Sequence, residues 1–297
     1  MKSTYSSTFK GNLNSSMNSA DVYLQEYSTG VAVRRYVSDS AGSGIAYLLQ
    51  NVYGRIYREQ IDKLVMQSGE KIAFRILEYG CGGGMNLIWI VRCLLDRGLK
   101  VDFACGTDFS PKMVEAAIKE VSASIPSTDN GKVSFHVVAN ENLSSGLSKE
   151  LGRPLKDLQN SFHLIVGVNT FRYCFRLGKQ AESASDIFSL LQPGGISVMI
   201  DMNRYFPFFR TRLRDRLTKP EDQRYLPTMD EYATAFRQAG FGIETKANFS
   251  WVPHSAGPAT LATVRTLSPM LQALFPRLAM RSLIIGRKPA ERTIRAD

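Results

Sequence analysis

The clearest chemical signal in this chain is an acidic residue followed at once by a glycine-rich turn. Glu78 ends a short apolar run, and a helix is expected to begin near Asn86; the glycines between them are Gly80, Gly82, Gly83 and Gly84. Glycines at such a junction let backbone N–H groups approach a ligand, because no Cβ intervenes. The helix N-terminus adds positive potential. An acidic residue directly before the turn disfavours a phosphate and favours a cationic amine.

Alternating strand and helix patterns position this turn. We predict strands at 72–79, 101–107, 133–138, 162–168, 196–202, 243–252 and 281–286, and helices at 86–97, from 111, at 180–191 and at 229–238. Several strands are continuous apolar runs, which suit a parallel sheet covered on both faces. The pattern predicts an α/β fold with a seven-stranded, mostly parallel sheet and helices on both faces.

Ligands bind beyond the carboxyl ends of the strands in such a sheet. The residues expected there are Glu78 to Gly84, Asp108 with Phe109, 139–141, and Asn169 to Tyr173. These four segments therefore make up the predicted site.

The remaining segments extend this core. Residues 1–20 are rich in Ser and Asn and are expected to form a flexible tail, and 21–70 a helical N-terminal cap, in which Tyr27, Tyr36 and Tyr47 are candidate pocket residues. The core spans 71–290, with substrate-side insertions at 203–227 and 253–280. The second insertion, before the last strand, is punctuated by prolines, and its roles as a lid and as a dimer contact both stay open.

The turn resembles a known motif. Residues 78–84 (Glu-Tyr-Gly-Cys-Gly-Gly-Gly) match the E-x-G-x-G-x-G pattern of the class I S-adenosylmethionine-dependent (SAM-dependent) methyltransferases. The resemblance covers 70–205 through motifs and extends to 287 through the order of elements. It implies that Gly80, Cys81, Gly82, Gly84 and Asn86 lie around the methionyl part of the cofactor, and that Glu78 engages its ammonium, directly or through water.

The later strand ends resemble the same family. Asp108 is then expected to accept hydrogen bonds from both ribose hydroxyls, and Phe109 to pack against the adenine. The family commonly has an Asp after strand three that meets the adenine amino group; here Asn140 or Glu141 must take this role. Asn169 would face the methyl end of the cofactor, and S-adenosyl-L-homocysteine would be the product.

The catalytic candidates lie near the end of strand four and in the C-terminal half. Methyl transfer from a sulfonium mainly needs proximity and alignment, and a general base only where the acceptor keeps a proton. His254 is the best-placed neutral base. Tyr173 and Arg172 are the other candidates, and Arg172 with Asn169 could orient a carboxylate or carbonyl of the substrate.

Three functions remain open. The first is methylation of a small organic acceptor. The second is a nucleic-acid or ribosomal-RNA methyltransferase, which the net charge of +10 and the arginine-rich segment 204–224 favour, although no stacking surface accompanies the charge. Strand four also ends in Asn169-Thr-Phe-Arg172, unlike the Asn/Asp-Pro-Pro-Tyr motif of many base N-methylases. The third is a catalytically silent SAM-binding protein.

The amino-acid composition indicates the class of protein and the cellular compartment that we expect. The 297 residues are 44% hydrophobic and 22% charged, as in ordinary soluble proteins. The four cysteines form no CxxC pair, which favours reduced thiols in a cytoplasmic protein, and with only three histidines no metal site is predicted. No apolar run approaches the roughly 20 residues that a membrane span needs. Besides the small-molecule acceptor, a homodimer partner stays open.

Overall fold

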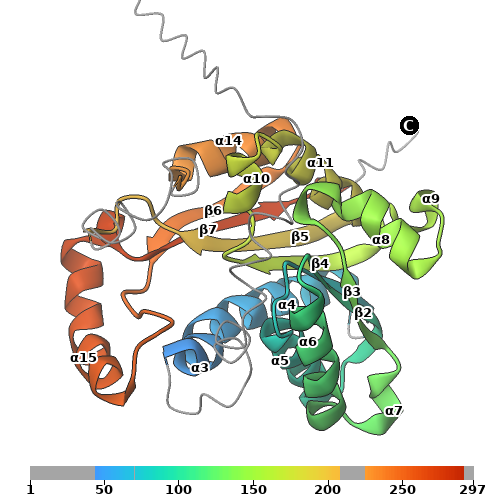
Figure 1. Ribbon diagram of the computed structural model, residues 1–297, viewed down its shortest axis with the longest axis horizontal. Helices are drawn as coiled ribbons and strands as arrows, with labels where there is room; N and C mark the ends of the chain where they lie inside the picture. Colours follow the sequence, from blue (N-terminus) through green and yellow to red (C-terminus); the bar gives the residue numbers. More distant parts are fainter. Residues whose placement is uncertain (1–43, 70, 208–224, 291–297) are drawn as a thin grey trace, which may run out of the picture.

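A seven-stranded sheet forms the centre of the computed structural model, which describes residues 44–69, 71–207 and 225–290 (Figure 1). The strand order is β3-β2-β1-β4-β5-β7-β6. The strands are β1 (Ala73–Tyr79), β2 (Lys100–Asp108), β3 (Val133–Val137), β4 (Phe162–Val168), β5 (Leu191–Met202), β6 (Gly242–Phe249) and β7 (Arg281–Arg287). Pairing is parallel from β3 to β5, whereas β7 runs antiparallel to β5 and β6. The predicted α/β fold with a mostly parallel sheet is therefore confirmed.

Helices cover both faces of the sheet (Figure 1). One face carries α3 (Gly44–Leu48), a π-helix η1 (Leu49–Tyr53), α4 (Gly54–Ser68), α5 (Met85–Asp96), α6 (Pro111–Ser124) and the short α7 (Ser127–Asn130). The other face carries the 3-10 helix η2 (Asn140–Asn142), α8 (Leu143–Leu151), α9 (Leu155–Leu158), α10 (Arg172–Arg176), α11 (Gln180–Leu190) and α14 (Met229–Gln238). Each face of the sheet is thus buried by its own helical layer.

Two apolar clusters, one on each side of the sheet, explain the continuous apolar strands. Ile76 and Leu164 belong to the cluster under α4 and α5. Their neighbours Leu77 and Ile165 point the other way and pack with Phe171 against the opposite helices. Successive side chains of a strand point to opposite faces, so a strand covered on both faces needs apolar residues at every position.

Local sequence signals fix where the helices begin. Gly84 caps α5 with a φ of +77°, and a Cβ on it would lie 2.7 Å from the Phe135 ring. The Ser110 side chain accepts a hydrogen bond from the Met113 N–H at the start of α6. Thr228 and Glu231 form a capping box at the start of α14, as their spacing predicts. These caps set the direction in which each helix leaves the sheet.

Two strand boundaries differ from the prediction by more than one residue. β5 begins at Leu191 rather than at 196, because Leu191 already pairs with Phe162 before a register shift between Phe162 and Leu164. β6 ends at Phe249 rather than at 252, and Ser250, with a φ of +58°, turns the chain away from the sheet. Both differences arise from pairing and turn geometry that propensity alone does not specify.

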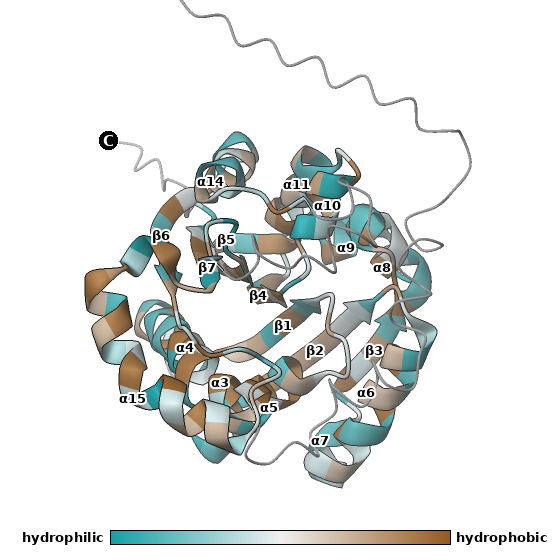
Figure 2. Cartoon of the chain, turned by 60° about the vertical axis from the view of Figure 1, so that its left-hand side comes forward, coloured by the Kyte–Doolittle hydropathy of each residue, from teal (hydrophilic) through white to brown (hydrophobic). Residues whose placement is uncertain are grey.

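The insertion before β7 is largely helical. It contains α15 (Pro258–Leu274) and the 3-10 helix η4 (Pro276–Leu278), and Pro269 lies within α15 without ending it. Leu261 is the only residue of α15 that is buried, and Leu267, Met270 and Leu274 are exposed. Several stretches of the α15 ribbon carry the brown colour of hydrophobic residues in Figure 2.

Some predictions fall on other parts of the chain. Three predicted segments lie outside the described residues. They are the tail at 1–20, the first part of the cap with Tyr27 and Tyr36, and 208–224, which is most of the arginine-rich segment. The division into tail, cap and core therefore stays a prediction. Within the described ranges, no helix combines the length and the hydropathy needed to cross a bilayer.

Candidate functional site

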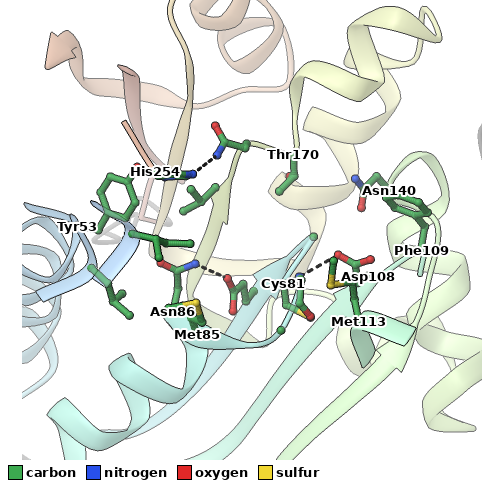
Figure 3. A pocket seen from close by; sticks show the side chains of 18 of the residues that line it. Tyr53, Cys81, Met85, Asn86, Asp108, Phe109, Met113, Asn140, Thr170 and His254 are labelled. Carbon is green, nitrogen blue, oxygen red and sulfur yellow. Dashed lines mark hydrogen bonds between the residues drawn. The ribbon is translucent and has the colours of Figure 1, made fainter. Parts of the chain in front are cut away.

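A cavity lies at the carboxyl ends of β1, β2 and β4 and brings together most of the predicted site residues (Figure 3). Its empty volume is about 750 Å³, including the opening to solvent. The predicted residues that line it are Glu78, Gly80, Cys81, Gly82, Asn86, Asp108, Phe109, Asn140, Asn169, Tyr173 and His254. Gly84, Glu141 and Arg172 are not among the lining residues.

Glu78 connects three elements beneath this cavity. Its Oε1 accepts a hydrogen bond from Asn86 Nδ2 at 2.7 Å, and its Oε2 accepts one from the Leu87 N–H at 2.9 Å. Tyr57 of α4 donates its hydroxyl proton to Asn86 Oδ1 at 3.1 Å. Burial raises the pKa of Glu78 to about 8, against the lowering effect of the two hydrogen bonds. The carboxylate thus holds β1, α5 and α4 together.

Asp108 is the second buried carboxyl group. It ends β2, the neighbour of β1, so it shares an edge of the sheet with Glu78. Its Oδ2 accepts from the Gly82 N–H and its Oδ1 from the Ser110 N–H, both at 2.9 Å. Burial raises the pKa of Asp108 to about 6, while these two bonds lower it. Neither carboxyl group forms an ion pair with the described residues.

The glycine turn lies close against the end of β4. Gly80 and Gly82 have φ values of +64° and +53°. A Cβ on Gly80 would lie 2.5 Å from Thr170 Cγ2, so a larger residue cannot take its place without displacing that side chain. The Cys81 N–H donates to the Thr107 carbonyl at 2.7 Å, which fixes the turn to β2.

Two buried polar atoms beside the cavity have no hydrogen-bond partner. Asn140 Oδ1 and Thr170 Oγ1 are both buried and unpaired, and both residues line the cavity. Leaving such an atom unsatisfied costs about 1–3 kcal/mol, so a ligand that supplies partners is favoured here. Of the predicted pair Asn140 and Glu141, Asn140 is the one that lines the cavity, on the same side as Phe109 and Asp108 (Figure 3).

His254 lies on the opposite side of the cavity from Asp108 (Figure 3). Its Nε2 is 2.9 Å from the hydroxyl of Tyr53, and its Nδ1 is 3.3 Å from Asn169 Nδ2. Asn169 Oδ1 accepts from Arg281 Nη1 at 3.2 Å, and Asn169 has a φ of +59°. Burial lowers the pKa of His254 well below its usual value, and the charges of Arg281 and Arg172 lower it further. His254 is therefore neutral at physiological pH.

Arg172 contacts Tyr173, which lines the cavity. Its Nη2 donates to the Tyr173 hydroxyl at 2.9 Å, and its guanidinium lies 3.9 Å from Asp201. The guanidinium carbons of Arg172 and Arg176 lie 4.9 and 5.1 Å from the centre of the Tyr173 ring. Tyr173 thus presents a ring held by two cations to the cavity wall.

The cap contributes cavity residues that were not predicted. Ile45, Leu49 and Tyr53 line the cavity, and with Tyr57 they recur every four residues, a helical spacing that could have identified this face. The predicted Tyr47 is not among the lining residues; the Arg265 guanidinium lies over its ring at 5.0 Å. Met85 and Met113 are further lining residues that sequence reasoning missed, whereas Thr170 falls within the predicted segment 169–173.

The loop that carries His254 is held against the cap. The Gly44 N–H donates to the Ala256 carbonyl at 2.8 Å, and a Cβ on Gly44 would lie 2.0 Å from the Pro253 carbonyl oxygen. Only glycine allows this approach. The close approach at Gly44 therefore holds the cap, with Tyr53, against the loop that carries His254.

Comparisons with known proteins give a consistent result for the fold. No protein-family model and no curated protein matches the sequence. Among solved structures, phosphoethanolamine N-methyltransferase 2 of Haemonchus contortus in complex with S-adenosyl-L-methionine matches with a TM-score of 0.57 and 14% identity, over 93% of this chain and 61% of that one. The CMeT domain of citrinin polyketide synthase matches with a TM-score of 0.52 and 18% identity, over 83% of this chain and 56% of that one.

A third similar structure comes from Galdieria sulphuraria and carries a provisional assignment as a sarcosine dimethylglycine methyltransferase. Its TM-score is 0.52 and its identity 13%, over 79% of this chain and 86% of that one. At such identities the likeness is one of fold. The chain has the fold of the class I SAM-dependent methyltransferases, as the glycine motif indicates.

The raised pKa of Glu78 leads to a prediction for the ligand-free protein. A carboxyl group whose pKa is higher in the folded state lowers the free energy of unfolding as the pH rises from about 4.5 to about 8. We expect Glu78→Gln to remove this contribution. As the pH rises, the free energy of unfolding of the variant should therefore increase relative to that of the wild type, by up to about 1.4 kcal/mol per pH unit.

Denaturant unfolding at a series of pH values measures this difference. Glu59→Gln, at an exposed position of α4, is the matched control for loss of a carboxyl group. A flat difference for Glu78→Gln would mean that Glu78 is ionised in the folded protein throughout this range.

Proposed function

We propose that this chain is a SAM-dependent methyltransferase that acts on a small organic acceptor. The observation that carries the proposal is the pair of buried carboxyl groups, Glu78 and Asp108, on adjacent strand ends in one cavity without a cationic side chain paired to them. Buried charges need a partner of opposite sign. A ligand that carries an ammonium and a sulfonium, together with a sugar diol, supplies that complement.

The lining residues fit the cofactor part by part. Glu78 and the turn Gly80–Gly82 would hold the methionyl ammonium and carboxylate. Asp108 still has lone pairs available beyond its two backbone bonds and would accept from the ribose hydroxyls. Phe109 would pack on the adenine, and the unpaired Oδ1 of Asn140 would accept from its amino group.

When bound, S-adenosyl-L-methionine supplies a methyl group that its sulfonium already activates. The protein then needs to position the acceptor and exclude water. Tyr53 of the cap lies beside His254, on the side of the cavity where Asn169 also lies, and Leu49 and Ile45 of the same helical segment also line the cavity. That side is the proposed acceptor end, and the helical wall supports an acceptor of small size.

The proposed cofactor site predicts a specific loss of affinity. Asp108→Asn removes the negative charge and one acceptor oxygen, and we expect it to weaken binding of S-adenosyl-L-methionine roughly ten- to a hundredfold, the effect of losing a hydrogen bond to a charged group. Calorimetry measures the change. Asp102→Asn lies on the same strand but is exposed, so it should bind as the wild type does. Equal affinity of both variants would remove Asp108 from the site.

Turnover separates an enzyme from a silent binding protein. We expect the wild-type protein to release S-adenosyl-L-homocysteine when it is given pooled small organic compounds, and Asp108→Asn to reduce that release. Cofactor binding without turnover across broad pools would favour the silent alternative. Salt-sensitive binding to RNA with RNA-dependent turnover would instead favour the nucleic-acid alternative.

His254 should affect the acceptor rather than the cofactor. It contacts Tyr53 and Asn169 at the proposed acceptor end, away from Asp108. We therefore expect His254→Ala to lower turnover of an acceptor found in the pools by about tenfold, because it removes the hydrogen bonds to Tyr53 and Asn169, with little change in cofactor affinity. Unchanged turnover would exclude His254 from the mechanism.

A further inference from the structure

Helix α15 leaves most of its surface to solvent. It lies at the edge of the molecule, outside the two helical layers that cover the sheet (Figure 1). Leu261 is the only buried residue among its 17. Its second half and the residue after it expose a group of large hydrophobic side chains, with exposed fractions between 42% and 62%: Leu267, Met270, Leu274 and Phe275. Single exposed apolar residues are ordinary, whereas a group of them marks an interaction surface.

Three of these side chains share the outward face of the helix. Leu267, Met270 and Leu274 follow one another at spacings of three and four residues, which places them on one stripe. The stripe lies opposite the buried side, because at about 100° per residue Met270 is turned by about 180° from Leu261. The other exposed residues of the outward face are small and uncharged: Ala259, Thr260, Ala262, Thr263, Thr266 and Ala273.

Two threonines of this face pair their hydroxyl groups within the helix itself. Thr263 Oγ1 donates to the Ala259 carbonyl and Thr266 Oγ1 to the Ala262 carbonyl, both at 3.1 Å. A hydroxyl group that is already paired costs less to remove from water than an unpaired one. The outward face is therefore suited to an environment that is poor in water.

The charges on and beside α15 are positive. Residues 245–290 contain neither aspartate nor glutamate. Arg265, near the middle of the helix, and Arg277, just after its end, are both exposed. Neither forms an ion pair with any residue that the structure describes. The apolar face is thus accompanied by positive charge, and its own stretch of chain supplies no negative charge.

We propose that α15 is an interfacial helix, which lies along the surface of a membrane that contains anionic lipids. Leu267, Met270 and Leu274 enter the boundary between headgroups and acyl chains. Arg277 lies at the lipid phosphates, and Arg265 adds to the positive potential. An amphipathic helix binds such a surface through its buried apolar area and through the attraction of its cations to anionic lipid. With 17 residues and an internal arginine, α15 is shorter and more polar than the roughly 20 apolar residues of a span.

A second copy of the chain fits this face less well. Two α15 helices packed face to face would place Arg265 and Arg277 of both copies around one contact, and residues 245–290 offer no carboxylate to pair with them. The net charge of +10 adds repulsion between copies. Anionic lipid supplies the opposite charge that a second copy lacks at this place.

Vesicle sedimentation with the full chain tests the proposal, and it requires no cofactor. We expect the wild type to bind vesicles of equal parts phosphatidylcholine and phosphatidylglycerol, and to bind pure phosphatidylcholine vesicles more weakly. The double variant Met270→Gln/Leu274→Gln should bind the anionic vesicles about tenfold more weakly, because it removes apolar area from the face. Arg277→Gln should weaken this binding about fivefold, the effect of one cation at an anionic surface.

Matched controls lie on other helices. Ile118 of α6 is 48% exposed, close to the value for Met270, and Arg92 of α5 is exposed. Ile118→Gln and Arg92→Gln should bind both kinds of vesicle as the wild type does. All these substitutions are at exposed positions, so the midpoint of thermal unfolding should stay near that of the wild type.

Three results would overturn the proposal. The first is a wild type that binds neither kind of vesicle, or binds both equally. The second is a Met270→Gln/Leu274→Gln variant that binds the anionic vesicles as tightly as the wild type, which would assign the binding to another part of the chain. The third is a wild-type dimer in sedimentation velocity that this double variant converts to a monomer, which would assign the face to a second copy.

Discussion

The site depends on one buried carboxyl group at the end of β1. Glu78 accepts from the first turn of α5 through Asn86 and Leu87, and Tyr57 of the cap completes the chain through Asn86. A carboxylate with no cation paired to it is unfavourable in such a place, which is why burial raises its pKa to about 8. The fold tolerates this cost because the same group fixes the glycine turn, the helix start and the cap in one arrangement, and because a cationic ligand can offset it.

The charges of the cavity are distributed unevenly. Glu78 and Asp108 make one part acidic, whereas Arg281 and Arg172 make the surroundings of His254 positive. Figure 3 shows Asp108 and His254 on opposite sides of the cavity. The proposed cofactor end and the proposed acceptor end of the cavity therefore differ in their electrostatic surroundings.

The sequence predicted the part of the site that local patterns encode. Glu78 and Asp108 each end an apolar strand run, and the parallel sheet brings such ends together, so their common cavity followed from the order of elements. The acceptor end was predicted only in part. The strand-end argument included the segment Asn169 to Tyr173. Tyr53 and Arg281 were not predicted, because they come from segments far apart in the chain and their contacts depend on how the cap and β7 pack against β4. Arg281 is an ordinary strand residue until its burial is known.

The helix at the start of the described chain couples the two parts of the cavity. Tyr53 and Tyr57 lie one turn apart, at the junction of the π-helix η1 and α4. Tyr57 is hydrogen-bonded to the Asn86 amide that holds Glu78, while Tyr53 meets His254. π-helical segments are rare and often occur at functional sites. A shift of this helix would therefore disturb the cofactor side and the acceptor side together, because each tyrosine reaches one of the two hydrogen-bond chains that define them.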